Sequence, residues 1–565
     1  MNNLPKHGHT RALHSLWLIL YLLLSMSPGF AQTTPARALK QPGNGNPLLP
    51  FLFTADPTAV EYEGRLYVYA TNDTEEFIAR GRQGGNTYGA IRTLAVMSTD
   101  DMVNWTFHGL IPACDIAGSW SFNSWAPSIV SREEEDGKTH FYLYFSNSGA
   151  GVGVLTATSP VGPWTAPRKT ALVDHSTPGV GKCAAPMDPG VVIDDEGTGW
   201  IAFGGGDSST GSEVFHGNAR IARLKPNLTE IDGEAAEIPA PYHFEANELN
   251  YMDGKWVYTY CSLWGNRDDW SQAGTSVKPS GMCSMDYMVS TNPLDPSSWK
   301  YAGEYFANPG NFGYPWYNNH THLHKYNGQY YLLYHTNWLE AEAKLETGGF
   351  RCVSMMRATV REKTAFIGTV TANNKGVSQI KALNPYATQQ AETMGTCAGL
   401  DYDNFVNAVN NNLRLSHKSL AIANIPAGAW VMVRGADFGA DGAGAFKARL
   451  RGRGTMEVRL DGIDNPAVAT VEFSSAGWRE VETSIDHSTV KGKHDIYFYF
   501  PETKTAQFDE WCFTQYSNGI RQVPHSSTHQ RINTSANYDL SGRRVLSGTR
   551  SRNVIICGGK KLLRL

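Results

Sequence analysis

The sequence predicts an all-β protein in which a five-bladed β-propeller is followed by a β-sandwich of the jelly-roll type. The chain of 565 residues contains 56 Gly, 26 Tyr, 23 Phe and 15 Trp, a composition typical of turn-rich β-structure. A turn-and-strand pattern recurs five times in the first two thirds of the chain, and a different pattern of short strands begins at Ala387. A chain of this length is also expected to form at least two domains.

The N-terminal segment has the layout of a secretory signal peptide. Lys6 and Arg11 precede an apolar stretch from Leu16 to Leu24, and Ala31 provides a small residue at the expected cleavage point. We therefore expect residues 1–31 to be a signal peptide and the protein to be secreted, whether periplasmic, cell-surface or extracellular. Residues 32–45 are expected to form a linker. No later segment approaches the roughly 20 continuous apolar residues of a membrane span, so no span is expected.

Charge and cysteine content argue against nucleic acid as a partner and against a zinc site. Lys and Arg total 49 and Asp and Glu total 53, giving a formal net charge of -4 with no long basic run, so nucleic acid is not an expected partner. The 8 cysteines include no C-x-x-C pair, which disfavours a zinc site, although some could pair in an oxidising compartment. The composition predicts no particular oligomeric state.

Residues 46–385 carry the repeat that predicts the propeller. Each copy is a polar residue followed by Gly, which indicates a tight turn, and then a strand rich in aromatic and β-branched residues. The five turns are Glu63-Gly64, Asp136-Gly137, Glu196-Gly197, Asp253-Gly254 and Asn327-Gly328. Most copies continue into a further strand and turn, and four-stranded units that repeat radially form a propeller.

The strand before each turn is expected to lie innermost in its blade. Counting back from the turn glycines gives equivalent positions that should converge on the propeller axis: Asp56, Ala126, Asp188, Glu245 and His320. In the fourth repeat Glu245 and Glu248 are three positions apart, so strand alternation predicts that only one of them faces the axis. The spacing favours Glu245, with Glu248 as the alternative.

Three convergent carboxylates suit glycoside hydrolysis. Two carboxyl groups that flank a glycosidic bond provide a general acid and a general base, and a charged neighbour keeps the acid protonated. Such a set could instead bind Ca²⁺, or the residues could simply cap turns. The shared position in the repeat favours the catalytic interpretation.

At these positions the sequence resembles glycoside hydrolase family 43, whose members are five-bladed propellers. The resemblance rests on five segments: Phe53–Pro57, Trp125–Ser128, Met187–Gly190, Phe244–Ala246 and Gly349–Arg351. It implies that Asp56 is the catalytic base, that Asp188 tunes the pKa of the acid and orients it, and that Glu245 is the proton donor. It further implies inversion at the anomeric carbon without a catalytic cofactor.

The resemblance also suggests residues that bind the substrate. His320 matches the active-site histidine of the family, and Arg351 matches an arginine that reaches the pocket. Aromatic residues near the mouth, among them Trp125 and Phe53, are expected either to stack on sugar rings or to fill the space between blades. One departure from many relatives is the sequence Glu245-Ala246-Asn247-Glu248, which keeps Glu248 open as the acid.

Residues 387–516 are predicted to form the sandwich, because short alternating strands follow one another between Gly and Asp turns. The ends of this region resemble carbohydrate-binding module family 6. The resemblance implies that the first and last strands lie together and share a structural Ca²⁺, with Glu392 and Asp509 as candidate ligands, and it places Cys397 and Cys512 near enough to pair. Residues 517–565 are expected to be a linker and a tail that resembles C-terminal sorting segments of exported bacterial proteins.

Together these features predict a secreted, inverting exo-glycosidase that acts on terminal sugars of plant cell-wall polysaccharide. The leading specificity is α-L-arabinofuranosidase on arabinoxylan. β-Xylosidase and β-galactofuranosidase stay open, because a single hydroxyl or methylene changes pocket contacts by only a few kcal/mol. Two further alternatives are a catalytically silent glycan-binding propeller and an invertase-like propeller that retains configuration.

Overall fold

The computed structural model describes residues 33–206, 214–215, 217–265, 280–406 and 420–517, together with four short strands of the tail. The predicted signal peptide, residues 1–31, lies outside the described residues. The described residues up to Tyr516 form one compact unit, and those of the segment 517–565 belong to a second. In the second unit the strands are β31 (Asn537–Tyr538), β32 (Arg544–Val545), β33 (Val554–Cys557) and β34 (Lys560–Leu563). In the described part of the chain, no helix has the length and apolar character needed to cross a membrane.

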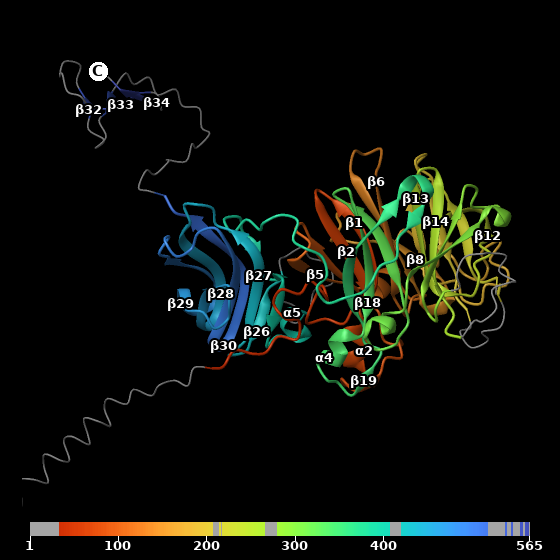
Figure 1. The fold of residues 1–565 in the computed structure, drawn as a ribbon, viewed down its shortest axis with the longest axis horizontal. Coiled ribbons are helices and arrows are strands. Elements are labelled where there is room, and N and C mark those ends of the chain that lie inside the picture. Colours follow the sequence, from red (N-terminus) through yellow and green to blue (C-terminus); the bar gives the residue numbers. More distant parts are fainter. Residues whose placement is uncertain are drawn as a thin grey trace, which may run out of the picture. The chain divides into compact units, whose positions relative to one another are not determined.

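Five antiparallel sheets follow one another along the first unit (Figure 1). The first contains β1 (Ala55–Tyr62), β2 (Arg65–Thr71), β4 (Leu94–Thr99) and β5 (Trp105–Ile111). The second contains β6 (Trp125–Glu133), β7 (Thr139–Ser146) and β8 (Val152–Ala157). The third contains β9 (Gly190–Ile193), β10 (Gly199–Phe203), β11 (Arg220–Leu224) and β12 (Ile231–Glu237). The fourth contains β13 (His243–Met252), β14 (Lys255–Ser262), β15 (Met285–Ser290) and β16 (Lys300–Phe306). The fifth contains β17 (Thr321–Tyr326), β18 (Gln329–Thr336) and β20 (Cys352–Ala358).

The first strands of the five sheets form a closed ring. Strand β1 contacts β6, β6 contacts β9, β9 contacts β13, β13 contacts β17, and β17 returns to β1. The segment before β1 closes the ring, because Leu48 N–H donates to Val353 O at 2.8 Å and Thr54 N–H donates to Arg351 O at 2.8 Å. The predicted five-bladed propeller is therefore confirmed.

Short elements connect the blades. The helices are α2 (Asp73–Ala79), α3 (Ala113–Ala117) and α4 (Trp338–Glu342), and the 3-10 turns are η1 (Ser148–Ala150), η3 (Pro296–Ser298), η4 (Pro309–Phe312) and η5 (Glu362–Thr364). The remaining short strands are β3 (Gly84–Gly85), β19 (Thr347–Gly348), β21 (Val360–Arg361) and β22 (Phe366–Ile367). Strands β3 and β19 pair in parallel, which brings the loop between β2 and β4 beside the loop before β20.

Each innermost strand of the first, second and fourth blades begins with a β-bulge. The register shifts between Ala55 and Thr58, between Trp125 and Ser128, and between Glu245 and Glu248. The second residue of each bulge has a left-handed backbone, with φ of 49° at Asp56, 40° at Ala126 and 64° at Ala246. Glu245 is therefore equivalent to Ala55 and Trp125 rather than to Asp56, which corrects the predicted alignment by one residue. Left-handed non-glycine residues cost about 1–3 kcal/mol and are concentrated at functional sites.

The sandwich is built on three long strands. Its elements are β23 (Gln389–Gln390), β24 (Thr393–Met394), β25 (Thr396–Ala398), α5 (Tyr402–Val406), β26 (Ile422–Ile425), β27 (Trp430–Asp437), β28 (Ala443–Leu460), β29 (Ala467–Ser484) and β30 (Lys493–Gln515). The order is β25-β27-β30-β28-β29, and β23 and β26 also pair with β30. The short alternating segments 444–449 and 455–460, which a Gly-containing stretch separates in the sequence, are the two halves of β28. The register shifts near Gly452, whose φ is 91°, so the strand is irregular there without being interrupted.

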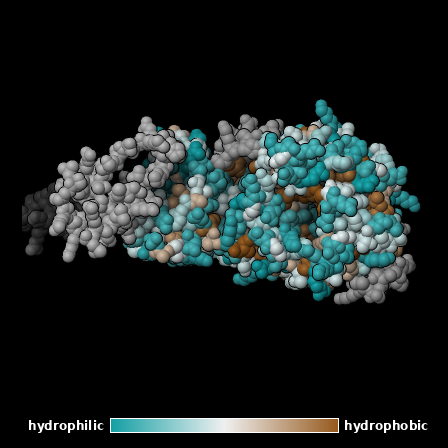
Figure 2. Space-filling view, turned by 90° about the horizontal axis from the view of Figure 1, so that it is seen from above, coloured by the Kyte–Doolittle hydropathy of each residue, from teal (hydrophilic) through white to brown (hydrophobic). Residues whose placement is uncertain are grey.

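The propeller and the sandwich share one interior. Strand β24 pairs with the outer strand β5 of the first blade, and the rings of Phe51 and Phe405 stack at 3.6 Å. The segment expected to be a linker, 32–45, is instead fixed from residue 33 onward, because Ala36 N–H donates to Gly428 O at 2.8 Å and Lys40 is fully buried. Figure 2 shows that the visible face is mainly hydrophilic, with hydrophobic side chains exposed in small separate areas.

Candidate active site

A pocket of about 90 Å³ lies at the beginning of the innermost strands. The lining residues are Asp56, Tyr88, Trp125, Met187, Asp188, Glu245, Asn318, His320 and Arg351. All three predicted carboxylates therefore line one cavity, together with the predicted His320, Arg351 and Trp125. The β-bulges of the first and fourth blades reorient the backbone at Asp56 and beside Glu245, and both of these residues line the pocket.

Asp56 is held as a carboxylate. Arg351 Nη1 donates to Asp56 Oδ1 at 2.9 Å, and Thr71 Oγ1 donates to Asp56 Oδ2 at 2.8 Å. Burial alone would raise the pKa of Asp56, but the Arg351 guanidinium and the contacts with His335 and His320 together hold it well below its usual range. An ionised carboxylate without its own proton can accept one from water, which is the requirement for a general base.

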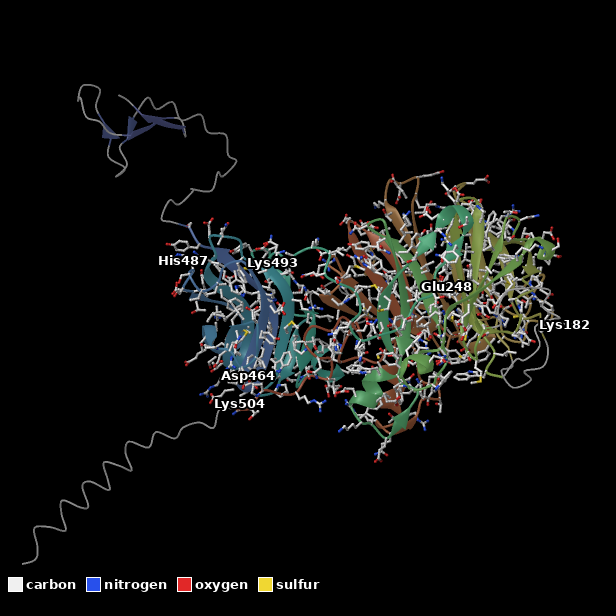
Figure 3. All side chains as sticks on the ribbon, in the orientation of Figure 1. Lys182, Glu248, Asp464, His487, Lys493 and Lys504 are labelled. Atoms are coloured by element: carbon white, nitrogen blue, oxygen red, sulfur yellow. The ribbon has the colours of Figure 1, made fainter. Side chains whose placement is uncertain are left out.

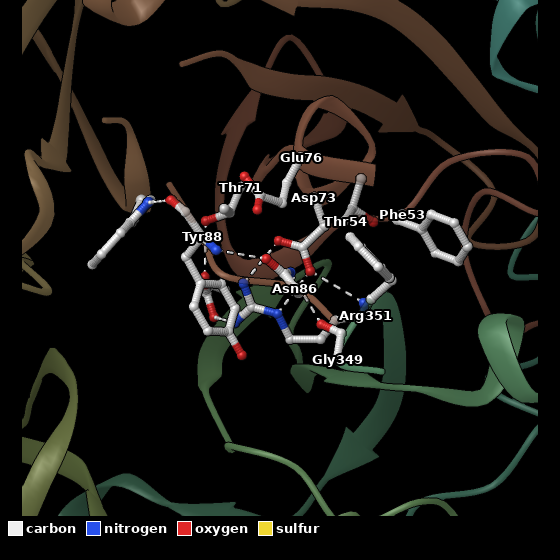
Figure 4. Close-up of polar contacts among 12 residues, drawn as sticks. Phe53, Thr54, Thr71, Asp73, Glu76, Asn86, Tyr88, Gly349 and Arg351 are labelled. Carbon is white, nitrogen blue, oxygen red and sulfur yellow. Dashed lines mark hydrogen bonds and ion pairs between the residues drawn. The ribbon is translucent and has the colours of Figure 1, made fainter. Parts of the chain in front are cut away.

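Arg351 is fixed by a residue that the sequence analysis missed. Its Nε and Nη2 donate to the two carboxylate oxygens of Asp73, each at 2.8 Å (Figure 4). Asp73 begins helix α2 and is fully buried. The bidentate pair sets the plane of the guanidinium and leaves Nη1 for Asp56. No local sequence signal identifies Asp73, because its partner lies 278 positions away in the chain.

Asp188 lies between the second and fourth blades. Ser146 Oγ accepts a hydrogen bond from the Asp188 N–H at 2.7 Å, and the Ala246 N–H donates to Asp188 Oδ2 at 2.9 Å. Burial raises the pKa of Asp188, His320 opposes that shift, and the charge of Asp56 adds to it. Asp188 thus holds Ala246, the residue next to Glu245, and its own carboxyl group is a second acidic group near Glu245.

Glu245 has the opposite protonation tendency from Asp56. Burial, followed by the charges of Asp188 and Asp56, raises its pKa to about 8, although Arg351 and a hydrogen bond from Asn318 oppose the shift. Glu245 is therefore mainly protonated at neutral pH and can act as a proton donor. One pocket thus contains an ionised carboxylate and a protonated carboxyl group, which is the pair that glycoside hydrolysis requires.

Two histidines support this pair. His320 Nδ1 lies 3.6 Å from Asp56 Oδ1. His335, which the sequence analysis did not identify, accepts the Asp56 N–H at Nδ1 at 3.2 Å, and its Nε2 lies 2.9 Å from Asn318 O. Burial lowers the pKa of His335, so a neutral ring that accepts at Nδ1 and donates at Nε2 satisfies both contacts.

Tyr88 and Trp125 form an aromatic wall of the pocket. The Tyr88 ring lies over the Arg351 guanidinium at 5.1 Å, and Trp125 Nε1 donates to Tyr88 O at 3.0 Å. Tyr88 has a left-handed backbone with φ of 60°. Sequence analysis missed it because it lies in the loop between β2 and β4, outside the repeated strands.

Glu248 takes no part in lining the pocket. It is buried within the propeller (Figure 3), and its Oε1 lies 2.8 Å from His322 Nδ1. His322 Nε2 in turn lies 3.3 Å from His324 Nδ1, so these residues form a polar chain in the interior. Of the two glutamates, Glu245 lines the pocket and Glu248 does not, and the register of the strand shifts between them.

Phe53 does not contact the pocket, contrary to its predicted substrate-binding role. Its ring packs against Phe77 at 5.1 Å and against Phe350 at 5.6 Å, in a buried cluster behind Arg351. The residue is 7% exposed. Its hydrophobic side chain therefore stabilises the loop that carries Arg351 rather than binding a sugar.

In the sandwich the first and last strands lie together, as the resemblance implied. Gln390 pairs with Glu510, and Ala391 N–H donates to Asp509 O at 2.8 Å. Glu392 and Asp509 are both buried. Among the described residues, no group of three or more His, Cys, Asp or Glu side chains is arranged to hold a metal.

The expected Cys397–Cys512 pairing is not formed. Both are free thiols, with Cys397 buried and Cys512 half-buried. Cys397 pairs with Val431 on β27, whereas Cys512 pairs with Lys447 on β28, so the two thiols belong to different ladders of the sheet.

The propeller fold, together with an ionised Asp56 and a protonated Glu245 in one pocket, defines a glycoside hydrolase of the propeller class. Comparison with known families agrees: residues 44–362 match "Glycosyl hydrolases family 43" and residues 390–515 match "Carbohydrate binding module (family 6)". The chain therefore belongs to glycoside hydrolase family 43, which confirms the predicted family and the predicted class of enzyme.

Several relatives are similar over most of the chain. The arabinoxylan arabinofuranohydrolase of Paenibacillus polymyxa is 36% identical, across 89% of this chain and 80% of the relative. The protein of the same name from Bacillus subtilis is 36% identical, across 88% of this chain and 98% of the relative. A crystal structure of a family 43 arabinoxylan arabinofuranohydrolase from Bacillus subtilis, in complex with cellotetraose, has a TM-score of 0.76 and 35% identity, covering 85% of this chain and 99% of that one.

Proposed function

We propose that the protein is an inverting exo-α-L-arabinofuranosidase that removes arabinofuranosyl groups from arabinoxylan. The observation that carries the proposal is the pairing of a carboxylate whose pKa is lowered, Asp56, with a carboxyl group whose pKa is raised to about 8, Glu245, in one small pocket. Similarity to the arabinoxylan arabinofuranohydrolases of two bacteria, over most of the chain, supports the choice of sugar and polymer.

In this proposal hydrolysis proceeds in one step, by a single displacement at the anomeric carbon. Asp56 accepts a proton from a water molecule, which attacks the anomeric carbon, while Glu245 donates its proton to the departing glycosidic oxygen. Asp188 keeps Glu245 protonated before the reaction and holds the neighbouring Ala246 N–H. Arg351 keeps Asp56 ionised and fixed through its bond at 2.9 Å. Attack from the face opposite the leaving group inverts the configuration.

The leaving-group dependence of two variants tests the assignment of acid and base. Glu245→Gln should lose nearly all activity on arabinoxylan but retain more on p-nitrophenyl α-L-arabinofuranoside, because nitrophenolate departs with little protonation. Asp56→Asn should be inactive on both. Glu248→Gln is the matched control, because Glu248 lies outside the pocket lining. If Glu248→Gln rather than Glu245→Gln gave the leaving-group pattern, the assignment of the acid would be wrong.

Product analysis tests the stereochemistry and the sugar. NMR of the first-formed anomer should show inversion, and a retained anomer would exclude the single displacement. A panel of aryl arabinofuranoside, xyloside and galactofuranoside should show turnover chiefly on the arabinofuranoside. Binding of arabinoxylan without turnover of any panel member would instead identify a silent glycan-binding protein.

We also propose that the protein is exported and that its sandwich holds a structural Ca²⁺. The layout of residues 1–31 supports export, which N-terminal sequencing of the mature protein tests. Glu392 and Asp509 fit a calcium ion, because burial and the charge of Asp509 raise the pKa of Glu392 well above its usual range, and Glu392 Oε1 has no hydrogen-bond partner among the described residues. A bound calcium ion would stabilise these oxygens as carboxylates.

A further inference from the structure

Two buried thiols lie together in the fourth blade. Cys261 and Cys283 are 22 positions apart in the chain, both are fully buried, and their Sγ atoms are 3.4 Å apart. A disulfide bond requires about 2.05 Å between the sulfur atoms, so a small rotation of either side chain would bring them to bonding distance. Among the described cysteines, no other two sulfur atoms lie within hydrogen-bonding distance of each other.

The backbone around the two cysteines is already held together. Cys261 is opposite Met285 in the ladder between β14 and β15. Cys283 N–H donates to Leu263 O at 3.0 Å, and Ser262 N–H donates to Ser284 O at 2.9 Å. The strand ends that carry the two thiols are therefore paired without the sulfur atoms, which makes a cross-link compatible with the fold.

The thiol pair lies directly behind the proton donor. On one side, Cys261 is the ladder partner of Glu245. On the other side, Cys283 O accepts from Asn319 Nδ2 at 3.3 Å and from Asn308 Nδ2 at 3.2 Å. Asn308 Nδ2 also donates to Tyr317 O at 2.7 Å, so Cys283 anchors the segment that carries Asn318, the hydrogen-bond partner of Glu245.

We propose that Cys261 and Cys283 form a disulfide bond in the mature, exported protein, and that this bond fixes Glu245 and Asn318 relative to each other. The bond itself depends on export to an oxidising compartment but not on the proposed substrate. Its positioning effect rests on the proposed function of Glu245.

The oxidation is a thiol–disulfide exchange with an external disulfide, carried by an oxidoreductase or by a small molecule. One cysteine thiolate attacks the external disulfide, forms a mixed disulfide and releases one thiol. The second cysteine then attacks the mixed disulfide and releases the other thiol, so two electrons and two protons pass to the oxidant. Burial raises the pKa of the Cys261 thiol well above its usual value, and both sulfur atoms are inaccessible in the folded chain. The exchange therefore takes place before the blade closes.

Thiol mapping of the full-length chain tests the bond. The protein is exported with its own N-terminus into a bacterial periplasm, quenched in acid, denatured and alkylated without reductant. We expect Cys261 and Cys283 to stay unlabelled until reduction and to occur in one cross-linked peptide. Cys114 and Cys183 are buried, and neither has a sulfur–sulfur contact among the described residues, so they are the internal control and should be labelled without reduction. Labelling of Cys261 and Cys283 without reduction, alongside the controls, would overturn the proposal.

Variants test the positioning effect separately. Replacing both cysteines by serine should lower Tm by several degrees and should reduce kcat on arabinoxylan severalfold more than kcat on the nitrophenyl substrate, because a displaced Glu245 donates its proton less effectively. Cys114→Ser is the matched control for loss of a buried thiol and should leave the ratio of the two activities unchanged. If the double serine variant does not fold, the double alanine variant replaces it. A cross-link found by mapping together with an unchanged activity ratio would refute the positioning role and leave the proposed function standing.

Discussion

Replacing Asp188 by Asn should move the alkaline limit of activity to lower pH. The alkaline limb of kcat/KM reports the loss of the Glu245 proton in the free enzyme. Burial is the largest cause of the raised pKa of Glu245, and the charge of Asp188 is the second largest. An asparagine keeps the shape of the side chain and an oxygen that can accept the Ala246 N–H, but it removes the negative charge.

The size of the effect follows from the pKa of Glu245. With a pKa of about 8, roughly nine tenths of Glu245 is protonated at pH 7, whereas with the ordinary value of 4.5 less than about 1% would be. Loss of the Asp188 charge lowers this pKa toward the ordinary value, so the protonated fraction at pH 7 falls between these two limits. Protonation alone should therefore reduce kcat/KM at pH 7, and the reduction should become smaller as the pH is lowered.

The measurement is kcat/KM against pH on an arabinoxylan oligosaccharide, whose leaving group needs the proton. Asp253→Asn is the control. Asp253 lies in the turn between β13 and β14, at the end of this hairpin away from Glu245, so its replacement should leave the pH profile unchanged. The reasoning fails if Asp188→Asn lowers activity by the same factor at every pH, since that would assign Asp188 an orienting role without a charge effect on Glu245.

Further predictions concern the pocket wall and the sandwich. Arg351→Gln should raise the pKa of Asp56, so the acidic limb of kcat/KM should move to higher pH; an unmoved limb would contradict the role given to the guanidinium. Asp73→Ala should cost about 3–5 kcal/mol in the free energy of unfolding, measured with urea, because it leaves Arg351 buried without its bidentate partner. Tyr88→Ala should raise KM on oligosaccharides more than Tyr88→Phe, which keeps the ring over Arg351; equal KM values for the two variants would argue against the aromatic wall. Chelation of calcium should lower the Tm of the wild type but not that of Glu392→Gln, and a wild-type Tm that is insensitive to chelator would argue against the calcium site.

The propeller was predictable from sequence because its repeated turns are marked by glycine and its strands by aromatic residues. The same repeat led to Asp56, Asp188 and Glu245, which all line the pocket. The exact register was not predictable, because the bulges have Asp56, Ala126 and Ala246 at their left-handed positions, and no glycine marks them.

The supporting residues of the site were missed for a different reason. Asp73 and Tyr88 both contact Arg351, which follows strand β19, and β19 pairs with β3 although the two strands are more than two hundred positions apart in the chain. Their loops carry no repeated pattern. A single sequence identifies residues that occupy repeated positions, but it does not identify partners that are brought together only when the ring of blades closes.

The pairing of β24 with β5 has a consequence for protein engineering. A catalytic fragment cut after residue 385 would lose the strand that covers the outer edge of the first blade, and it would expose to water the face of Phe51 that now stacks on Phe405. Such an uncovered edge favours aggregation. Chimeras that exchange the sandwich should therefore retain residues 386–406 and the N-terminal segment from residue 33, so that the contacts between the two domains are kept.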